Sequence, residues 1–270
     1  MILPLNRRYM FSGQSVAWGV MGQGEPLVLV HGTPFSSQVW RRIAPQLAKS
    51  RHVFYFDLLG YGQSEMRDGQ DVSLGVQNNL LAEIVAHWNL KHPSVLCHDF
   101  GAATVLRAAA LSGLRYSGVT MFDAVALSPW GSPFVQHVRS HEAAFRGLPA
   151  YAHDAMLRAY LQGAAHLPLN EQALAIYMKP WQGAMGQAAF YRQIAQMDQA
   201  YTDEIWTRGV DLGGNVKLLW GTEDRWIPVQ QGERLANLLK CGPVELVPDC
   251  GHLMQDDAPE AIVAAVLNPR

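Results

Sequence analysis

The sequence lacks the features that would place it outside the ordinary globular class. Only three of its 270 residues are cysteines, too few for a disulfide framework, so we expect reduced thiols and a cytoplasmic protein. No apolar run reaches membrane-spanning length, and residues 1–8 lack the order of a secretory signal, so no membrane contact is expected. The net charge is only −2 and no basic stripe is present, so we expect no nucleic-acid partner.

What the chain does have is alternation of strand-like and helical patterns. With 49% hydrophobic and 16% charged residues, it can bury one large core plus an insertion. The strand-like runs are 27–30, 53–56, 93–97, 121–127, 216–220 and 244–247, and the helical runs are 39–47, 75–88, 102–111, 229–239 and 258–267. A hairpin is predicted over residues 8–20. Buried parallel strands joined by crossover helices predict an α/β fold.

Between residue 128 and about residue 210 the strand-like runs stop. Alanine, histidine and aromatic residues dominate there, and prolines separate short helical stretches. This pattern predicts a helical cap at 129–208 inserted into a core made of 1–128 and 209–270. A cap over an active site excludes water and lines an apolar pocket.

The segment Cys97-His98-Asp99-Phe100-Gly101-Ala102 has the form of a nucleophile elbow, with aspartate at the position of the nucleophile. An apolar run precedes it and a helix-forming run follows it, which is the strand–turn–helix context that the motif needs. The helix N-terminus favours an ionised carboxylate at Asp99. The same pattern also fits an aspartate that only caps the helix.

An aspartate nucleophile changes the chemistry that is expected. A carboxylate that displaces a group from a saturated carbon forms an ester, which water can open, whereas serine would form an inert ether. Asp99 therefore favours substrates such as epoxides or alkyl halides.

Three further segments complete a candidate site. The loop His31-Gly32-Thr33-Pro34 follows an apolar run, and the Thr33 and Phe100 N–H groups would form an oxyanion hole. Asp224 lies in the loop after a late strand. His252 follows the last strand, so the order is nucleophile, acid, histidine.

Together these residues resemble the α/β-hydrolase superfamily, and by nucleophile its Asp-dependent branch of epoxide hydrolases and haloalkane dehalogenases. The resemblance covers the whole chain and rests on His-Gly-x-Pro, on His-Asp-x-Gly-Ala and on the loop from Asp57 to Ser64. It implies a mostly parallel eight-stranded sheet flanked by helices, with the cap inserted after the sixth strand. Asp99 would be the nucleophile, and His252, held by Asp224, would activate water. No cofactor or metal is implied.

The leaving group decides between the two activities. In epoxide hydrolases cap tyrosines protonate the oxygen, and the segment Ala189-Phe190-Tyr191-Arg192 is similar to the one that carries such a tyrosine. Tyr191 is therefore predicted as a donor, with Tyr151 as the second and Tyr160 and Tyr201 as competitors. Phe100 and Thr33 replace the usual halide-binding residues of dehalogenases, although Trp130, Trp181 or His137 could supply a donor from the cap.

The sequence thus favours an epoxide hydrolase acting on a small apolar organic molecule. A dehalogenase that releases halide is the alternative. A third hypothesis, from another class, is a non-catalytic protein of the same fold that binds a small molecule. The complete set of Asp99, Asp224 and His252 argues for turnover, because a binding protein has no use for the base. The oligomeric state cannot be read from the sequence.

Overall fold

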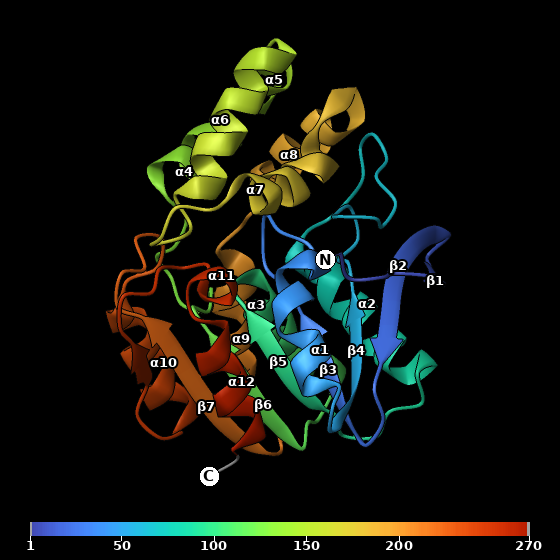
Figure 1. Cartoon of the computed structure of the whole chain (residues 1–270), viewed down its shortest axis with the longest axis vertical. Helices are drawn as coiled ribbons and strands as arrows, with labels where there is room; N and C mark the ends of the chain where they lie inside the picture. The colour runs from blue at the N-terminus through green and yellow to red at the C-terminus, as the bar shows by residue number, and fades with distance from the viewer. Residues whose placement is uncertain (1, 269–270) are drawn as a thin grey trace.

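The computed structural model describes residues 2–268 and is built around one eight-stranded sheet (Figure 1). The strand order is β1-β2-β4-β3-β5-β6-β7-β8. The strands are β1 (Arg7–Phe11), β2 (Gln14–Met21), β3 (Glu25–Val30), β4 (Arg51–Phe56), β5 (Ser94–His98), β6 (Gly118–Phe122), β7 (Asn215–Gly221) and β8 (Glu245–Val247). The β1–β2 hairpin and the β2–β4 pair are antiparallel, and every other pair is parallel. The sheet therefore has the predicted architecture.

Helices cover both faces of the sheet. The helices of this layer are α1 (Ala44–Leu47), α2 (Leu74–His87), α3 (Phe100–Ser112), α9 (Ala200–Arg208), α10 (Val229–Leu239), α11 (Met254–Asp257) and α12 (Pro259–Leu267). On one face α1 contacts α12, and on the other α2 and α9 flank α3 (Figure 1). The parallel strands are buried by both layers, which explains their continuous apolar runs.

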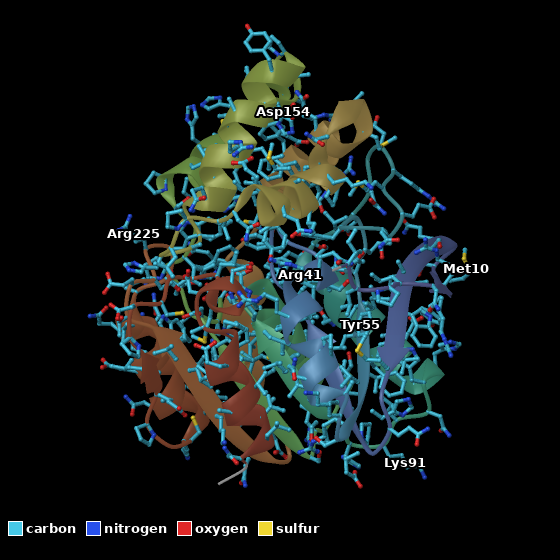
Figure 2. All side chains as sticks on the ribbon, viewed as in Figure 1. Met10, Arg41, Tyr55, Lys91, Asp154 and Arg225 are labelled. Carbon is cyan, nitrogen blue, oxygen red and sulfur yellow. The ribbon has the colours of Figure 1, made fainter. Side chains whose placement is uncertain are left out.

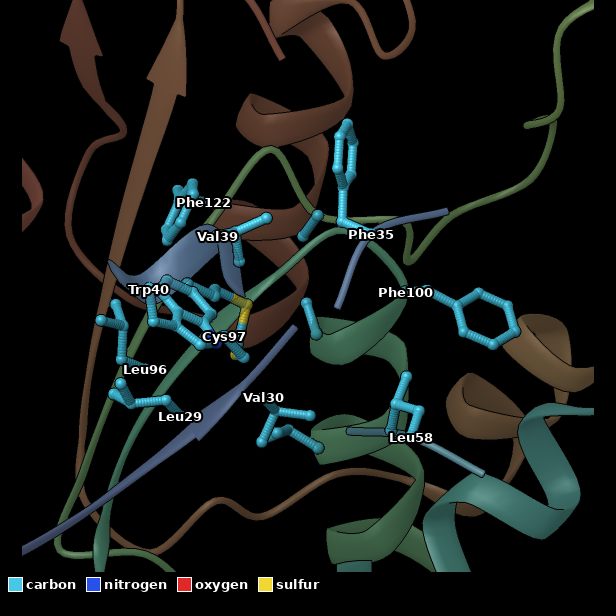
Figure 3. Close-up of a cluster of buried hydrophobic side chains, with 14 of the residues drawn as sticks. Leu29, Val30, Phe35, Val39, Trp40, Leu58, Leu96, Cys97, Phe100 and Phe122 are labelled. Atoms are coloured by element: carbon cyan, nitrogen blue, oxygen red, sulfur yellow. The ribbon is translucent and has the colours of Figure 1, made fainter. Parts of the chain in front are cut away.

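The centre of the core lies between the middle strands and the two layers of helices. Val28, Leu29 and Val30 of β3 have no exposed surface. Figure 3 shows Leu29 and Val30 in one cluster with Trp40, Leu96 and Phe122. The side chain of Phe100 extends away from this cluster (Figure 3). The carboxyl ends of β3 and β5 are thus held rigidly, and they carry the candidate site.

The cap lies over the carboxyl ends of the parallel strands and is inserted between β6 and β7 (Figure 1). Its helices are α4 (Pro133–Ser140), α5 (Glu142–Arg146), α6 (Ala150–Gln162), α7 (Glu171–Met178) and α8 (Gly183–Ala195). Figure 2 labels Asp154 on the cap helix α6 and Arg225 on the core loop after β7. Helix α9 packs on α3 in the core, where Arg107 lies 3.0 Å from Glu204.

Two predicted elements were wrong in extent. The predicted strand 121–127 ends at Phe122, because Asp123 takes a positive φ of 45° that breaks the extended chain. The predicted helix 39–47 is a 3₁₀ turn, η1 (Ser37–Arg42), followed by the single turn of α1. Pro45 explains the break, since proline fits the first turn of a helix and not its interior. None of the helices within residues 2–268 is long and apolar enough to cross a membrane.

Candidate active site

Asp99 occupies a sharp turn between β5 and α3. Its backbone has φ 53° and ψ −122°, a conformation that side-chain-bearing residues adopt only when the surroundings impose it. Its carbonyl oxygen accepts hydrogen bonds from Ala102 (3.0 Å) and Val125 (3.2 Å), which help to fix the turn. The Asp99 side chain is 4% exposed, and its carboxylate faces the loop that follows β3.

Two glycines allow the turn and that loop to approach each other. A Cβ atom at Gly32 would lie 2.5 Å from the Asp99 Cβ and Oδ1 atoms. At Gly101 it would lie 2.3 Å from the Val30 carbonyl oxygen. No side chain fits at such distances, so glycine is required at both positions. The motif spacing in the sequence therefore has a direct steric reason.

The Thr33 N–H donates a 2.8 Å hydrogen bond to Asp99 Oδ1, as expected for half of the oxyanion hole. Burial by itself would raise the pKa of Asp99. The hydrogen bond and charge of His252 and the hydrogen bond of the Phe100 N–H outweigh burial and leave the pKa of Asp99 below its ordinary value. Asp99 is therefore an ionised carboxylate at neutral pH.

His252 bridges the two carboxylates. Its Nε2 lies 3.3 Å from Asp99 Oδ2, and its Nδ1 lies 2.9 Å from Asp224 Oδ2. The other Asp224 oxygen accepts the backbone N–H groups of Trp226 (2.7 Å) and Ile227 (2.9 Å), so the acid is held in place. The three predicted members of the triad thus lie side by side, with His252 hydrogen-bonded to Asp224 and within ion-pair distance of Asp99.

Two negative neighbours control the charge of His252. Its burial would lower its pKa, but the charges and hydrogen bonds of Asp224 and Asp99 raise the pKa well above the ordinary histidine value. When both carboxylates are ionised, His252 is therefore an imidazolium. A change in the charge of Asp99 would alter its proton affinity at once.

Two other buried histidines hold the framework. His31 Nε2 accepts the Leu58 N–H at 2.9 Å, and burial lowers its pKa, so this ring is neutral and orders the loop before Thr33. His98 donates from Nε2 to the His252 carbonyl oxygen at 2.9 Å, and burial is the largest cause that lowers its pKa to about 3. Neither ring is placed to accept a proton from substrate.

Asp123, at the end of β6, was not among the predicted site residues. Its Oδ1 accepts the Gly221 N–H at 2.9 Å, while no partner for Oδ2 lies within residues 2–268. Burial, and then the charge of Asp224, raise the pKa of Asp123 well above its ordinary value. Its carboxyl group therefore holds its proton more tightly than a free aspartate does. A lone aspartate after a strand gives no sequence signal for this shift.

A cavity of about 40 Å³ lies between Asp99 and the cap. It is lined by Thr33, Asp99, Phe100, Val125, Trp130, Gly131, Ser132, Val135, Tyr160, Met197, Trp226 and Ile227. Most of these side chains are apolar. A larger hollow of about 730 Å³ lies near the amino ends of β7 and β8, and no predicted site residue lines it. The small cavity is thus the one that belongs to the chemistry.

The structure does not bring the predicted cap tyrosines to this cavity. Tyr191 is fully buried inside the cap and does not line the cavity. His153 donates from Nε2 to the Trp181 carbonyl oxygen, so its Nδ1 accepts the Tyr191 hydroxyl at 2.9 Å. Tyr151 is 80% exposed on the outer face of α6. Neither Tyr191 nor Tyr151 is therefore placed to donate a proton to the leaving group, and both predictions were wrong.

Trp130 does line the cavity, but its indole N–H is used elsewhere. It donates to the Thr202 hydroxyl at 2.8 Å. Trp130 therefore forms an apolar wall and has no free N–H for a leaving group.

Tyr160, named only as a competitor, lines the same cavity as Asp99. Burial raises the pKa of Tyr160, and the charge of Asp99 adds to this effect. On α6 the buried residues His153, Leu157 and Leu161 recur every four positions. Tyr160 flanks that stripe, whereas Tyr151 lies off it. The four-residue spacing of the buried positions on α6 could thus have shown that Tyr160 is a better candidate than Tyr151.

A polar group that the sequence did not indicate adjoins the oxyanion hole. The amide oxygen of Gln193, on α8, accepts the Thr33 hydroxyl at 2.5 Å and the Tyr61 hydroxyl at 3.1 Å. Trp181, also from the cap, donates to the Pro34 carbonyl oxygen at 2.7 Å. The cap therefore binds the same loop that supplies the Thr33 N–H.

The described part of the chain shows no group of three or more His, Cys, Asp or Glu side chains arranged to hold a metal ion. The three cysteines are unpaired; Cys97 and Cys250 are buried and Cys241 is partly buried. Burial raises the pKa of the Cys97 thiol far above its ordinary value, so this neighbour of Asp99 is not a thiolate nucleophile.

A comparison with protein-family models agrees with this geometry. The model described as the alpha/beta hydrolase family matches residues 27–265, most of the chain. The chain belongs to the alpha/beta hydrolase family. This membership confirms the predicted fold class and supports the prediction of a hydrolase.

Three known proteins illustrate what this chain is similar to. A crystal structure of an alpha/beta hydrolase fold protein from Burkholderia ambifaria is 55% identical and has a TM-score of 0.97, covering 100% of this chain and 99% of that one. A haloalkane dehalogenase from Sphingobium indicum is 27% identical over 184 residues, which span 64% of this chain and 61% of the relative. A solved epoxide hydrolase is 21% identical with a TM-score of 0.76, covering 97% and 96% of the two chains, and supports the fold alone.

Proposed function

We propose that this hydrolase opens a bond at a saturated carbon of a small apolar substrate through an ester on Asp99. The proposal rests on one observation, which is that the two carboxylate oxygens of Asp99 have different partners. Oδ1 accepts the Thr33 N–H at 2.8 Å, and Oδ2 lies 3.3 Å from His252 Nε2 beside the apolar cavity. One oxygen is thus held while the other adjoins the base, as nucleophilic catalysis followed by hydrolysis requires.

In the first step Asp99 Oδ2 forms a bond to the substrate carbon. The bond from that carbon to the leaving atom breaks, and its electron pair goes to the leaving atom. The lowered pKa of Asp99 keeps the nucleophile ionised at neutral pH. The apolar cavity favours this step because it removes the water that would solvate the carboxylate.

The first step also prepares the second. Once Asp99 is an ester it carries no charge, so one of the two neighbours that raise the pKa of His252 is lost. His252 can then lose its Nε2 proton, which accompanies a departing halide into solvent or replaces the proton given to an alkoxide, and it becomes a base toward water. Asp224 keeps the proton on Nδ1 and stabilises the imidazolium that forms.

His252 takes a proton from the water as the water attacks the carbonyl carbon of the Asp99 ester, and the Thr33 and Phe100 N–H groups would bind the oxyanion that develops. The bond from that carbon to the ester oxygen then breaks, and this oxygen leaves with the substrate carbon and takes the proton from His252 to become the product hydroxyl. Asp99 gives its remaining proton to His252 and is a carboxylate again.

An epoxide is the favoured substrate because a tyrosine adjoins the cavity. Tyr160 keeps its proton at neutral pH because its pKa is raised, so it can donate to the alkoxide that ring opening forms. This residue takes the role first assigned to Tyr191. An alkyl halide is the second candidate, since the Sphingobium indicum relative is a haloalkane dehalogenase. A halide leaves without a proton.

Labelled water tests the ester route. In a single turnover in heavy-oxygen water, the label is expected in Asp99 first and in product only in later turnovers. His252→Gln should still alkylate and then stall, so intact-mass analysis would show enzyme plus substrate fragment. Label that goes directly to product would contradict the proposal and leave Asp99 as a general base. Binding without any turnover would instead support the non-catalytic alternative.

A further inference from the structure

Trp226 lines the cavity beside Asp99 and also contacts the base of the triad. It lies in the loop after β7, two positions after Asp224. Its backbone N–H donates to Asp224 Oδ1 at 2.7 Å and so helps to hold the acid. Its indole ring meets the imidazole of His252 with 4.9 Å between the ring centroids and 32° between the ring planes. The main chain of this residue therefore holds the acid, while its side chain reaches the base.

The indole of Trp226 is itself held from the cap. The phenol ring of Tyr160, on α6, stacks on it with the ring centroids 4.7 Å apart and the planes 22° apart. Aromatic pairs with centroids roughly 4.5–7 Å apart attract each other beyond the effect of the area that they bury. Tyr160 therefore helps to keep the indole against His252 while the cap covers the cavity.

The titratable groups that face His252 come from the ends of β5, β6 and β7. Asp224 lies 2.9 Å from its Nδ1, and Asp99 lies 3.3 Å from its Nε2. The ring centroid of His98 is 4.7 Å away, and this ring is neutral because its pKa is lowered to about 3, mainly by burial. Asp123 has a raised pKa, which the charge of His252 counteracts. Once Asp99 is an ester, the imidazolium therefore keeps the hydrogen bond to ionised Asp224 but loses the second carboxylate.

The indole lies where it can stabilise the remaining charge. The face of an indole is the negative part of its quadrupole, and it attracts a cation that lies within about 6 Å of the ring centroid. The 4.9 Å between the rings of Trp226 and His252 is within this range, and a tilt of 32° brings the rings closer to face-to-face than to edge-to-face. Tryptophan makes the strongest contact of this kind, and exclusion of water strengthens it further. His252 has no exposed surface, so its imidazolium meets this condition.

We propose that the indole of Trp226 stabilises protonated His252 through a cation–π contact while the Asp99 ester is hydrolysed. The inference rests on the proposed Asp99 ester route. The indole takes up no proton and forms no bond to the substrate, so Trp226 is a positioning residue that acts through His252. It makes His252 a stronger base toward water, and it moves the loss of the His252 proton to higher pH.

A pH jump tests this effect on the ester alone. The enzyme is mixed with 1-bromopropane or 1,2-epoxypropane at acidic pH, where protonated His252 lets the Asp99 ester accumulate. The solution is then brought to a series of higher pH values, and intact mass follows the decay of the ester. In Trp226→Leu, which keeps the backbone N–H on Asp224 but removes the aromatic face, the midpoint of the decay profile should fall by about 0.4–1.5 pH units. The limiting decay rate at high pH should fall about twofold to tenfold, because a weaker base removes the proton of water more slowly.

Two further variants separate the aromatic face from the bulk of the side chain. Trp226→Phe keeps a ring against His252, so its midpoint should lie closer to that of the parent than to that of Trp226→Leu. Trp130→Leu is the matched control, because Trp130 lines the same cavity but makes no ring contact with His252 within residues 2–268. It also enlarges the cavity, and it should leave the midpoint of ester decay where it is in the parent.

The outcomes separate this inference from the proposed function. No adduct with either probe in His252→Gln overturns the ester route and the role of Trp226 with it. An adduct in Trp226→Leu that decays with the midpoint of the parent overturns the role of Trp226 alone. Equal downward shifts in Trp226→Leu and Trp226→Phe, or an equal shift in Trp130→Leu, would mean that the side chain only keeps water from the base, and the cation–π contact is then wrong. The amount of adduct formed at acidic pH shows that each variant is folded, and Trp226→Met, which also lacks an aromatic face, replaces Trp226→Leu if that protein forms none.

Discussion

The carboxyl edge of the sheet and the cap face the same cavity, but they position their side chains in different ways. At the sheet edge, strand ends and tight turns set the positions of Asp99, Asp224 and His252, and main-chain N–H groups hold two of the three. In the cap, side chains hold side chains, as His153 does for Tyr191. At the sheet edge, therefore, backbone geometry sets the positions of the reacting groups. In the cap, the packing of the helices determines which residues contact the substrate.

The largest effect on catalysis is expected for Asp224, because it is the carboxylate that stabilises protonated His252 once Asp99 is an ester. Asp224→Asn removes the charge that stabilises the His252 imidazolium and allows the wrong tautomer, so ester hydrolysis should slow by about 10²- to 10⁴-fold. Quenched-flow mass analysis would show the adduct accumulating. Alkylation and ester hydrolysis that both proceed at the wild-type rate would remove Asp224 from the triad.

The pH dependence sharpens the same prediction. Alkylation should stay constant as the pH falls through neutrality, because the pKa of Asp99 is lowered. Ester hydrolysis should rise with pH, because only neutral His252 accepts a proton from water. In Asp224→Asn the midpoint of that rise should move to lower pH, since the charge that raises the pKa of His252 is gone. A midpoint that moves upward would contradict the assignment.

A steric change at the sheet edge should have the next largest effect. In Gly32→Ala the new Cβ would lie 2.5 Å from Asp99 Oδ1, so the carboxylate or the Thr33 loop must shift. A loss of alkylation rate on the order of 10²-fold is expected. Gly118→Ala in β6 is the matched control, because its Cβ would have 3.7 Å to the nearest atom. Similar losses in both variants would indicate general damage to the sheet.

In the cap, Tyr160→Phe should affect only one class of substrate. Removing its hydroxyl should slow epoxide opening by about 10- to 100-fold and spare an alkyl bromide, whose leaving group needs no proton. The comparison is made with 1,2-epoxypropane and 1-bromopropane. Equal losses on both would mean that Tyr160 only shapes the cavity.

The smallest effect on catalysis is expected for Tyr191→Phe. The variant removes the hydroxyl that His153 Nδ1 accepts inside the cap, so the unfolding free energy should fall by about 1–3 kcal/mol. Turnover at saturating substrate should remain close to wild type. Thermal unfolding and steady-state kinetics would be measured on the same preparation. A selective loss of epoxide opening in this variant would return Tyr191 to the active site.

The sequence predicted the sheet edge well because its signals are local. Within a few residues of Asp99 lie a strand, a helix and a glycine at a position that has no room for a side chain. Asp224 and His252 likewise follow strands, in the expected order. Tyr151 and Tyr160 differ only in which face of α6 carries them, and that depends on packing. Gln193 gave no signal, because its hydrogen bonds are to Thr33 and Tyr61, which are distant in the chain.

The size of the cavity has a kinetic consequence. About 40 Å³ is well below the roughly 300–1,000 Å³ of typical small-molecule pockets. We therefore expect the cap to move away from Asp99 when a substrate enters and again when a product leaves. Opening of the cap then competes with chemistry as the slowest event of the cycle. Steady-state turnover would respond to solvent viscosity, while the first, pre-loaded turnover would not.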